Sequence, residues 1–211
     1  MIFARWTMLC LIAASTLLLT ATAWTQDHFQ LHSTAFEDGG TAPLFMIKNE
    51  LSSSGVNACT ASGTVGPDQS PELSWTGVPR GTQSFVVVAY DSTANFTHWG
   101  MYNIAAAIHE LPQNAGVANS TYGPEIVNDT VGFSEYDGPC PPPNVTPDVH
   151  SYVFTVYALD RMLDLPSSTN FPAAAETLYQ ALIEAGERGH ILGHASLTAF
   201  YSATPGTQHT D

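Results

Sequence analysis

Three short runs of β-branched and aromatic residues constrain the fold of this chain more than any other feature of its sequence. They lie at residues 84–90 (SFVVVAY), 99–104 (WGMYNI) and 152–159 (YVFTVYAL). Uninterrupted apolar runs of this kind are typical of strands that are buried on both faces of a sheet. Prolines and glycines punctuate the intervals between the runs, and such residues mark turns. The sequence therefore predicts a core of strands joined by turns.

One helix is expected near the C-terminal end of the chain, over residues 173–188. Asn170 can cap its first turn, Pro172 suits its start, and Gly189 can end it. The expected helix carries an apolar stripe that would dock on a sheet, formed by Leu178, Leu182 and Ala185. Residues 191–201 (ILGHASLTAFY) then have the composition of a final strand.

The order of these elements favours an antiparallel sheet core over a doubly wound α/β fold, because the strands come first and the helix comes late. We therefore expect a mainly β protein with a two-sheet, antiparallel, β-sandwich-like core and peripheral helices. The sequence contains no internal repeat, low-complexity linker or block of charge, which predicts a single domain. A Gly-rich phosphate loop after a strand, a GxSxG elbow and an HExxH helix are also absent from the sequence.

Residues 1–23 have the organisation of a signal peptide. Arg5 supplies positive charge, residues 8–20 form an apolar run, and residues 21–23 (ATA) have the small-x-small pattern of a cleavage site. The apolar run is shorter than the ~20 residues that a membrane-spanning helix needs. We therefore expect a mature domain at residues 24–211, without a stable membrane anchor, that is secreted to a periplasmic or extracellular location.

The mature domain is poor in positive charge. Its cationic side chains are Lys48, Arg80, Arg161 and Arg188, whereas the chain carries 19 Asp and Glu residues. Nucleic acids and anionic membranes attract proteins through clustered Lys and Arg side chains. The charge balance therefore excludes nucleic acid as a partner.

Two cysteines, Cys59 and Cys140, remain after the leader. Outside the cytoplasm two thiols can pair with each other, so we predict a disulfide between them. The sequence alone does not give the distance between the two residues.

Polar side chains cluster at the ends of the apolar runs, where pockets commonly form. Asp91 follows the first run directly, and His98 precedes the second. His150 and Tyr152 are two residues apart on an expected strand, so their side chains would point to the same face. A carboxylate, two imidazoles and a phenol together can bind an anionic group. Taken singly, each residue is as well explained by a structural role.

Read together, these stretches resemble the phosphatidylethanolamine-binding protein family, in its bacterial Raf-kinase-inhibitor-like branch. The likeness extends in order over nearly the whole mature chain, and the GPCPP and H-x-Y elements are its most specific parts. It rests on residues 29–43 (FQLHSTAFEDGGTAP), 70–75 (SPELSW), 78–85 (VPRGTQSF), 98–103 (HWGMYN), 136–142 (YDGPCPP), 150–160 (HSYVFTVYALD) and 195–201 (ASLTAFY).

The resemblance implies a two-sheet β fold with a small cavity that takes phosphate-like and acetate-like groups. It also implies which residues bind the ligand: Asp91, His98, Pro142, His150 and Tyr152. Where the family has D-P-D-A-P, this chain has residues 91–95 (DSTAN), so that Thr93 replaces the second acid. Residues 47–58 match the family poorly and resemble an inserted loop, and the stretch from Pro142 to His150 is longer than usual.

We therefore expect a binding protein rather than an enzyme, with no cofactor and no metal. Its expected partner is a small phosphorylated or carboxylate ligand, such as a lipid headgroup, alongside a protein partner. One alternative is a protease or kinase inhibitor that acts through surface loops, in which Asn144 and residues 47–58 would matter most. Another is a hydrolase or metal-dependent enzyme that uses Asp91, His98 and His150.

Overall fold

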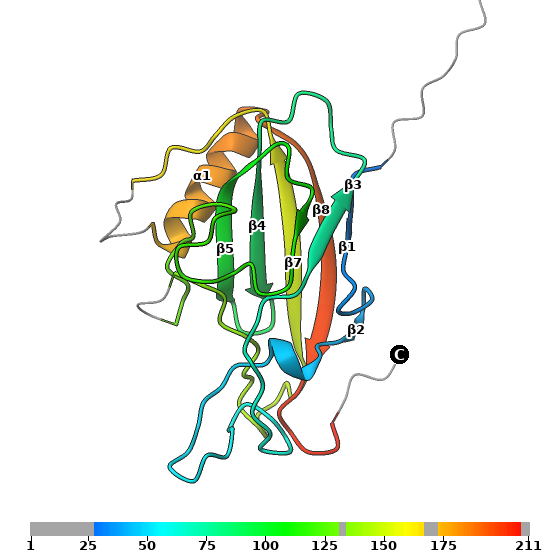
Figure 1. Cartoon of the computed structure of the whole chain (residues 1–211), viewed down its shortest axis with the longest axis vertical. Helices are drawn as coiled ribbons and strands as arrows, with labels where there is room; N and C mark the ends of the chain where they lie inside the picture. The colour runs from blue at the N-terminus through cyan, green and yellow to red at the C-terminus, as the bar shows by residue number, and fades with distance from the viewer. Residues whose placement is uncertain (1–27, 131–133, 167–172, 208–211) are drawn as a thin grey trace, which may run out of the picture.

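Two β-sheets and one long helix form the framework of the molecule (Figure 1). The structure is a computed structural model, and it describes residues 28–130, 134–166 and 173–207; the leader expected at residues 1–23 lies outside them. The larger sheet has the strand order β2-β8-β7-β4-β5. Its strands are β2 (Gly40–Thr41), β4 (Ser84–Asp91), β5 (Phe96–Ala105), β7 (His150–Leu159) and β8 (Ile191–Tyr201).

The smaller sheet has the order β1-β3-β6 and consists of β1 (Gln30–His32), β3 (Leu73–Thr76) and β6 (Glu110–Leu111). A short 3-10 helix, η1 (Leu44–Met46), follows β2, and α1 (Ala175–Glu187) precedes β8. Pairing is antiparallel except between β2 and β8, which run parallel. The expected mainly β, two-sheet fold is therefore confirmed, and the four long strands lie where the sequence predicted them.

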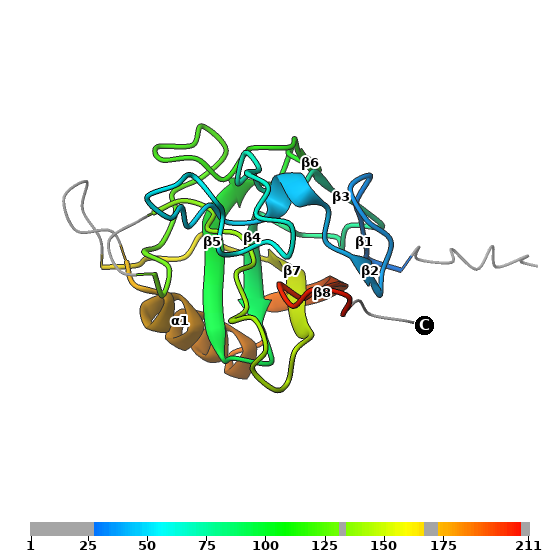
Figure 2. The ribbon, with the colours of Figure 1, turned by 90° about the horizontal axis from the view of Figure 1, so that it is seen from below.

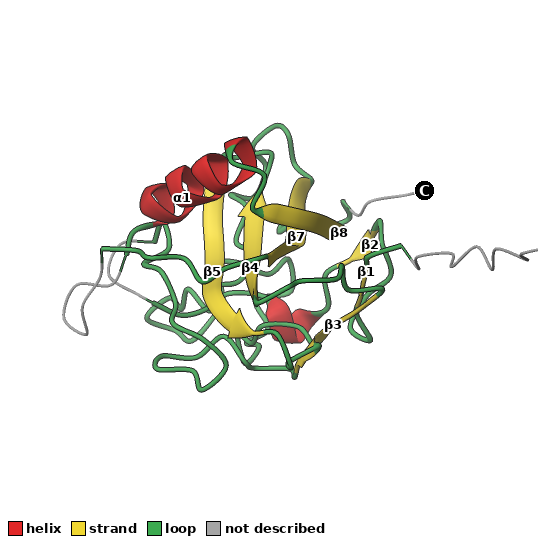
Figure 3. Ribbon diagram, turned by 90° about the horizontal axis from the view of Figure 1, so that it is seen from above, coloured by secondary structure: helices red, strands yellow, loops and turns green. Residues whose placement is uncertain are grey.

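Strand β4 shows why the large sheet is apolar on both faces. Phe85, Val87 and Ala89 belong to the core that also contains residues of the smaller sheet. Val86 and Val88 instead belong to a second core, which contains the buried residues of α1. Figures 2 and 3 show the same layering from below and above, with α1 on one side of β4 and β5, and β1 and β3 toward the other. Because successive side chains of a strand alternate between faces, a continuous apolar run supplies both layers.

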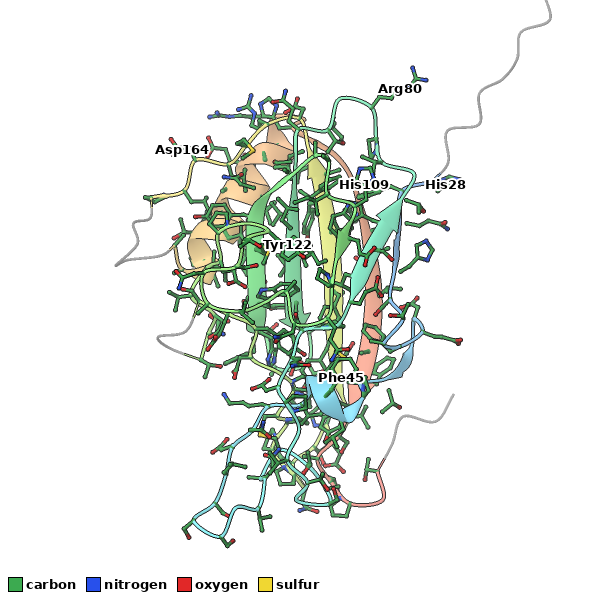
Figure 4. All side chains as sticks on the ribbon, in the orientation of Figure 1. His28, Phe45, Arg80, His109, Tyr122 and Asp164 are labelled. Atoms are coloured by element: carbon green, nitrogen blue, oxygen red, sulfur yellow. A yellow bond between two sulfur atoms is a disulfide. The ribbon has the colours of Figure 1, made fainter. Side chains whose placement is uncertain are left out.

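The inter-sheet core also holds the loops in place. Phe45 and Tyr122, which are labelled in Figure 4, pack against it from η1 and from the loop after β6. No helix among the described residues is long and apolar enough to span a membrane.

The start of the helix differs from the sequence expectation. Ala174 is extended (φ −77°, ψ 162°) and α1 begins at Ala175, two residues later than predicted. The cause is pairing with another segment, because the Val127 amide donates to the Ala173 carbonyl at 2.8 Å and the Ala175 amide donates to the Val127 carbonyl at 3.2 Å. Ala174 offers no side-chain cap. The cap predicted at Asn170 and the first-turn role predicted for Pro172 lie outside the described residues.

A disulfide joins Cys59 to Cys140 across a sequence separation of 81 residues, as the sequence led us to expect. It links the segment after η1, drawn in cyan at the bottom of Figure 1, to the proline-rich stretch before β7. Tyr201, the last residue of β8, donates its hydroxyl to the Cys59 carbonyl at 3.0 Å. The inserted segment is therefore attached to the domain both covalently and by hydrogen bonds.

One ionisable side chain is buried near the core without full hydrogen bonding. Glu125 is 7% exposed and accepts a bond of 2.7 Å from the Trp99 indole through Oε1, whereas its Oε2 has no partner among the described residues. The pKa of this carboxyl is raised from 4.5 to about 8, chiefly by loss of solvation. The Trp99 bond lowers the pKa and the nearby Glu135 charge raises it, and both effects are smaller.

The helix layer gives the first prediction. Leu178 is 1% exposed and its Cδ2 lies close to Gly100 of β5, whereas Ile183 on the same helix is 54% exposed. Leu178→Ala should lower the free energy of unfolding by about 2–5 kcal/mol, because it leaves a cavity in the core. Ile183→Ala is the matched control and should change it by less than about 0.5 kcal/mol. Urea denaturation measures both, and equal losses would contradict the packing described here.

The disulfide gives the second prediction. The variant with both Cys59→Ser and Cys140→Ser should lose about 2–4 kcal/mol of stability, because the unfolded chain is no longer cross-linked. Thiol titration of the mature, unfolded and unreduced protein should find no free thiol. Two titratable thiols in that measurement would show that the bond is absent.

The buried carboxyl of Glu125 gives the third prediction. A pKa raised on folding means that the folded state holds its proton more tightly, so this contribution is full below about pH 4.5 and is lost as the pH rises to about 8. Glu125→Gln removes the titration, so the variant should gain stability relative to the wild type, on the order of 3 kcal/mol between about pH 5 and about pH 9. Chemical denaturation across that range measures the difference, and parallel pH profiles would refute the assignment.

Candidate functional site

A cavity of ≈ 270 Å³ opens where one end of the large sheet meets the proline-rich stretch. The neighbouring strands β7, β4 and β5 are antiparallel, so the start of β7, the end of β4 and the start of β5 lie at the same edge. Asp91 ends β4, His150 begins β7, and His98 is the third residue of β5. All five residues predicted to bind a ligand line this cavity: Asp91, His98, Pro142, His150 and Tyr152.

The Asp91 carboxylate lies at the floor of the cavity, which it forms with His98, His150 and Tyr152, and it is only 2% exposed. Its Oδ1 accepts the backbone amides of Thr93 at 2.8 Å and Ala94 at 3.0 Å, and its Oδ2 accepts Nδ1 of His150 at 2.6 Å. Tyr152 lies close enough to feel the Asp91 charge, which after burial is the largest cause that raises the pKa of its phenol. A carboxylate with this many donors remains an acceptor and holds its partners in one orientation.

Tyr152 lies between the two imidazoles. Its ring centroid is 5.2 Å from that of His98 in an edge-to-face arrangement and 6.4 Å from that of His150 in a stacked one. Burial raises the pKa of the Tyr152 phenol far above its usual value, and the Asp91 charge raises it further. The phenol is therefore a neutral group that fixes the spacing of the two histidines.

His98 is held by a different kind of acceptor. Its Nδ1 lies 2.6 Å from the carbonyl oxygen of Asp137, and the Asp137 amide donates back to the His98 carbonyl at 3.1 Å. Burial lowers the pKa of the His98 imidazole, against smaller opposing effects of the Asp137 carbonyl and the Asp137 and Asp91 charges. The ring is therefore neutral near pH 7, with its proton on Nδ1.

The segment after η1 places two charged side chains at this cavity, Lys48 and Glu50. The Lys48 ammonium donates to Oδ2 of Asp137 at 2.8 Å, and the Thr130 hydroxyl donates to the same oxygen. The Lys48 backbone amide donates to the Pro139 carbonyl at 3.2 Å. The segment that matches the family poorly thus contributes directly to the mouth of the cavity.

The wall opposite the strands is built around Gly138. A Cβ at this position would lie 1.9 Å from the Met46 carbonyl oxygen, so the wall can approach the rest of the protein only with glycine there. The Gly138 amide donates to Oδ1 of Asp68 at 2.9 Å. Burial raises the pKa of Asp68 to about 6, with the Asp137 charge as a further cause, while the Gly138 bond lowers it. Past this point Cys140, Pro141 and Pro142 continue the wall.

Thr93 explains how the chain manages without the second acid that the resemblance led us to expect. Its hydroxyl oxygen accepts the Ser151 backbone amide at 3.0 Å. The side chain therefore ties the β4–β5 turn to β7, next to His150. Compared with the family pattern, Thr93 in place of the second acid removes one negative charge from this turn.

Metal ligation has one geometric candidate among the described residues. Glu50, Cys59 and Cys140 bring three ligand atoms within 4.8 Å of one another. Both cysteines are spent in the disulfide, so they offer no thiolate there. Asp91, His98 and His150 do not form such a group within the described part of the chain.

The sequence predicted the residues of the cavity floor, but not those of its rim, which are Lys48, Glu50, Thr130 and Asp137. Asp137 directly precedes the GPCPP element and belongs to the matching stretch 136–142 (YDGPCPP), so its position was a usable signal. Lys48 is one of very few cations in the chain, but only its spatial position reveals that it faces Asp137. Glu50 and Thr130 carried no signal in the sequence.

Comparison with known proteins identifies the family to which the chain is similar. Residues 32–202 match the family model described as phosphatidylethanolamine-binding protein. The chain is 37% identical over 141 residues to a UPF0098 protein of Methanothermobacter thermautotrophicus, covering 64% of this chain and 84% of the relative. It is 33% identical over 144 residues to the UPF0098 protein YbhB of Escherichia coli, with 65% and 84% covered.

Two crystal structures share the fold. Escherichia coli YbcL, described as a new member of the mammalian PEBP family, superimposes with a TM-score of 0.64 at 26% identity, covering 82% of this chain and 98% of that one. A homologue from Chlamydia trachomatis gives a TM-score of 0.59 at 26% identity, with 82% and 97% covered. The family match spans most of the chain, from β1 to the end of the last strand, so this protein belongs to the phosphatidylethanolamine-binding protein family.

Proposed function

We propose that this protein binds a small ligand through a phosphate or carboxylate group in the cavity at the end of β4, β5 and β7. The observation that carries the proposal is the convergence of Asp91, His98, His150 and Tyr152 on one hollow, although they are far apart in the sequence. Buried imidazoles that line a cavity and are oriented by acceptors behind them are typical of a preformed polar binding site.

The lining has the composition of a binding pocket. Phe96, Pro141 and Pro142 provide apolar walls, while His150 and Lys48 provide the donors that an anionic group requires. Nδ1 of His150 donates to Asp91, and in the doubly protonated form of the ring Nε2 is a second donor that faces the ligand.

Binding without turnover is part of the proposal. The hydroxyl of Thr130 and the ammonium of Lys48 both donate to Asp137, and the Tyr152 phenol is held neutral. Thr130 and Lys48 share one carboxylate oxygen and neither donates to a histidine, so they lack the hydroxyl–imidazole pairing that activates a serine-type nucleophile.

We further propose that binding takes place outside the cytoplasm. The leader pattern at residues 1–23 supports export, and the disulfide between Cys59 and Cys140 suits an oxidising compartment. Natural partners are accordingly sought among periplasmic or extracellular small molecules.

The fourth prediction tests the pocket. In His150→Asn the amide nitrogen takes the place of Nδ1, so the hydrogen bond to Asp91 can persist while the Nε2 donor is removed. Affinity for inorganic phosphate and for acetate should fall about tenfold, as expected for the loss of one hydrogen bond to a charged group. Isothermal titration calorimetry measures it on the mature protein.

His194→Asn is the matched control, because His194 is exposed on β8 and does not line the cavity. Its affinities should equal those of the wild type. Wild-type protein that binds neither phosphate nor acetate, or a His150→Asn variant with unchanged affinity for both, would remove the basis of the proposal.

A further inference from the structure

The two histidines of the cavity are held by their Nδ1 atoms in the same way but against different groups. Nδ1 of His150 lies against the carboxylate of Asp91, and Nδ1 of His98 lies against the carbonyl oxygen of Asp137, each at 2.6 Å. A carbonyl or carboxylate oxygen only accepts, so both Nδ1 atoms carry hydrogen. Among the described residues neither Nε2 has a hydrogen-bond partner, which leaves Nε2 of each ring for the ligand.

The two Nε2 atoms therefore have opposite roles. His150 has the Asp91 carboxylate against its Nδ1, and the doubly protonated form of this ring donates from Nε2. His98 is 7% exposed and has Lys48 as a charged neighbour, and both favour its neutral form. The Asp137 carbonyl and the charges of Asp137 and Asp91 oppose this, but burial outweighs them. The Nε2 of a neutral ring protonated at Nδ1 is an acceptor. The other two neighbours of the ring are aromatic: Phe96 packs beside it and Tyr152 packs edge-to-face against it.

Other acceptors reinforce His98. Three carboxylates line the cavity, from Glu50, Asp91 and Asp137, against the single ammonium of Lys48. Lys48 and Thr130 share Oδ2 of Asp137, and Asp91 is occupied by its own donors. A ligand that consists only of acceptor oxygens would therefore be repelled by the Nε2 lone pair of His98 and by the nearby carboxylates.

We propose that the cavity selects an oxyanion that still carries a proton, namely a phosphate with a P–O–H group, which donates to Nε2 of His98 while its charged oxygens accept from His150 and Lys48. This inference rests on the proposed function and adds the chemical class of the ligand. Inorganic phosphate and singly ionised phosphate monoesters have such a hydroxyl. Sulfate and phosphodiesters, including diester lipid headgroups, do not.

The comparison that tests it uses ions of matched shape. Inorganic phosphate, sulfate, methyl phosphate and dimethyl phosphate are titrated separately into the mature protein by calorimetry, in a buffer without oxyanions. The titrations are run at about pH 5.5, below the second pKa of a phosphate monoester, which is about 6. Sulfate has the size and shape of phosphate without the proton, and dimethyl phosphate is the diester without the proton.

Phosphate should bind about 10–100-fold more tightly than sulfate, because a mismatched acceptor leaves a buried polar group unpaired. Methyl phosphate should exceed dimethyl phosphate by a similar factor. The second comparison also separates the two sources of phosphate, since a free phosphate or monoester and a diester lipid headgroup give opposite orders of affinity.

His98→Gln tests the role of the residue. The side-chain amide of glutamine can present an N–H near the position of Nε2, which turns the acceptor into a donor. The ratio of phosphate to sulfate affinity should then fall to within about threefold, chiefly because sulfate gains. His194→Gln, at the exposed position on β8, is the control and should keep the wild-type ratio. Thermal denaturation establishes that each variant is folded. If His98→Gln does not fold, His98→Asn replaces it, because asparagine can retain the bond to the Asp137 carbonyl. The His98→Asn variant should lose phosphate affinity and selectivity together.

The outcomes separate the two levels of the argument. A wild-type protein that binds phosphate and sulfate equally, or the diester as well as the monoester, overturns the selectivity and leaves the anion site standing. A folded His98 variant with the full wild-type ratio overturns the role of His98. Wild-type protein that binds none of the four ions contradicts the proposed phosphate site itself.

Discussion

The hydrogen bonds of the buried Asp91 carboxylate are the constraint on which the rest of the site depends. They join two parts of the chain: the turn after β4 through two backbone amides, and the start of β7 through His150. A buried carboxylate is costly unless donors surround it, so these partners stabilise the charge and are themselves held in place. The geometry of the cavity floor follows from this one group.

The rim is built on a separate principle, that of cross-linking. The segment after η1 has no long strand to hold it, and the disulfide, the Lys48 contacts and the close approach at Gly138 attach it to the proline-rich wall. Acceptors of different charge behind the two histidines then give the floor one donor and one acceptor. A site that displays both kinds of group is more selective than a purely cationic one, because each mismatch leaves a buried group unpaired.

Much of the fold could be predicted because its cause is local. The run SFVVVAY is β-branched and aromatic whatever surrounds it, and β4 forms there. The helix start was predicted two residues early, because Ala173 and Ala175 bond to Val127, a partner that lies far away in the sequence. The candidate site divides in the same way, since Asp91 and His150 stand at strand ends that periodicity locates, while Lys48 and Glu50 lie in a segment without a periodic pattern.

The sequence by itself determined where the four long strands lie, that the protein is mainly β and acidic, and that its motifs resemble the phosphatidylethanolamine-binding proteins. Composition and spacing are enough for this, because burial preferences act on each stretch separately. Only the tertiary structure decided that Lys48 meets Asp137, that Thr93 bonds to β7, and that the two imidazoles face acceptors of different charge. Hydrogen-bond roles depend on which atom lies opposite each ring nitrogen, and the order of residues along a chain does not specify it.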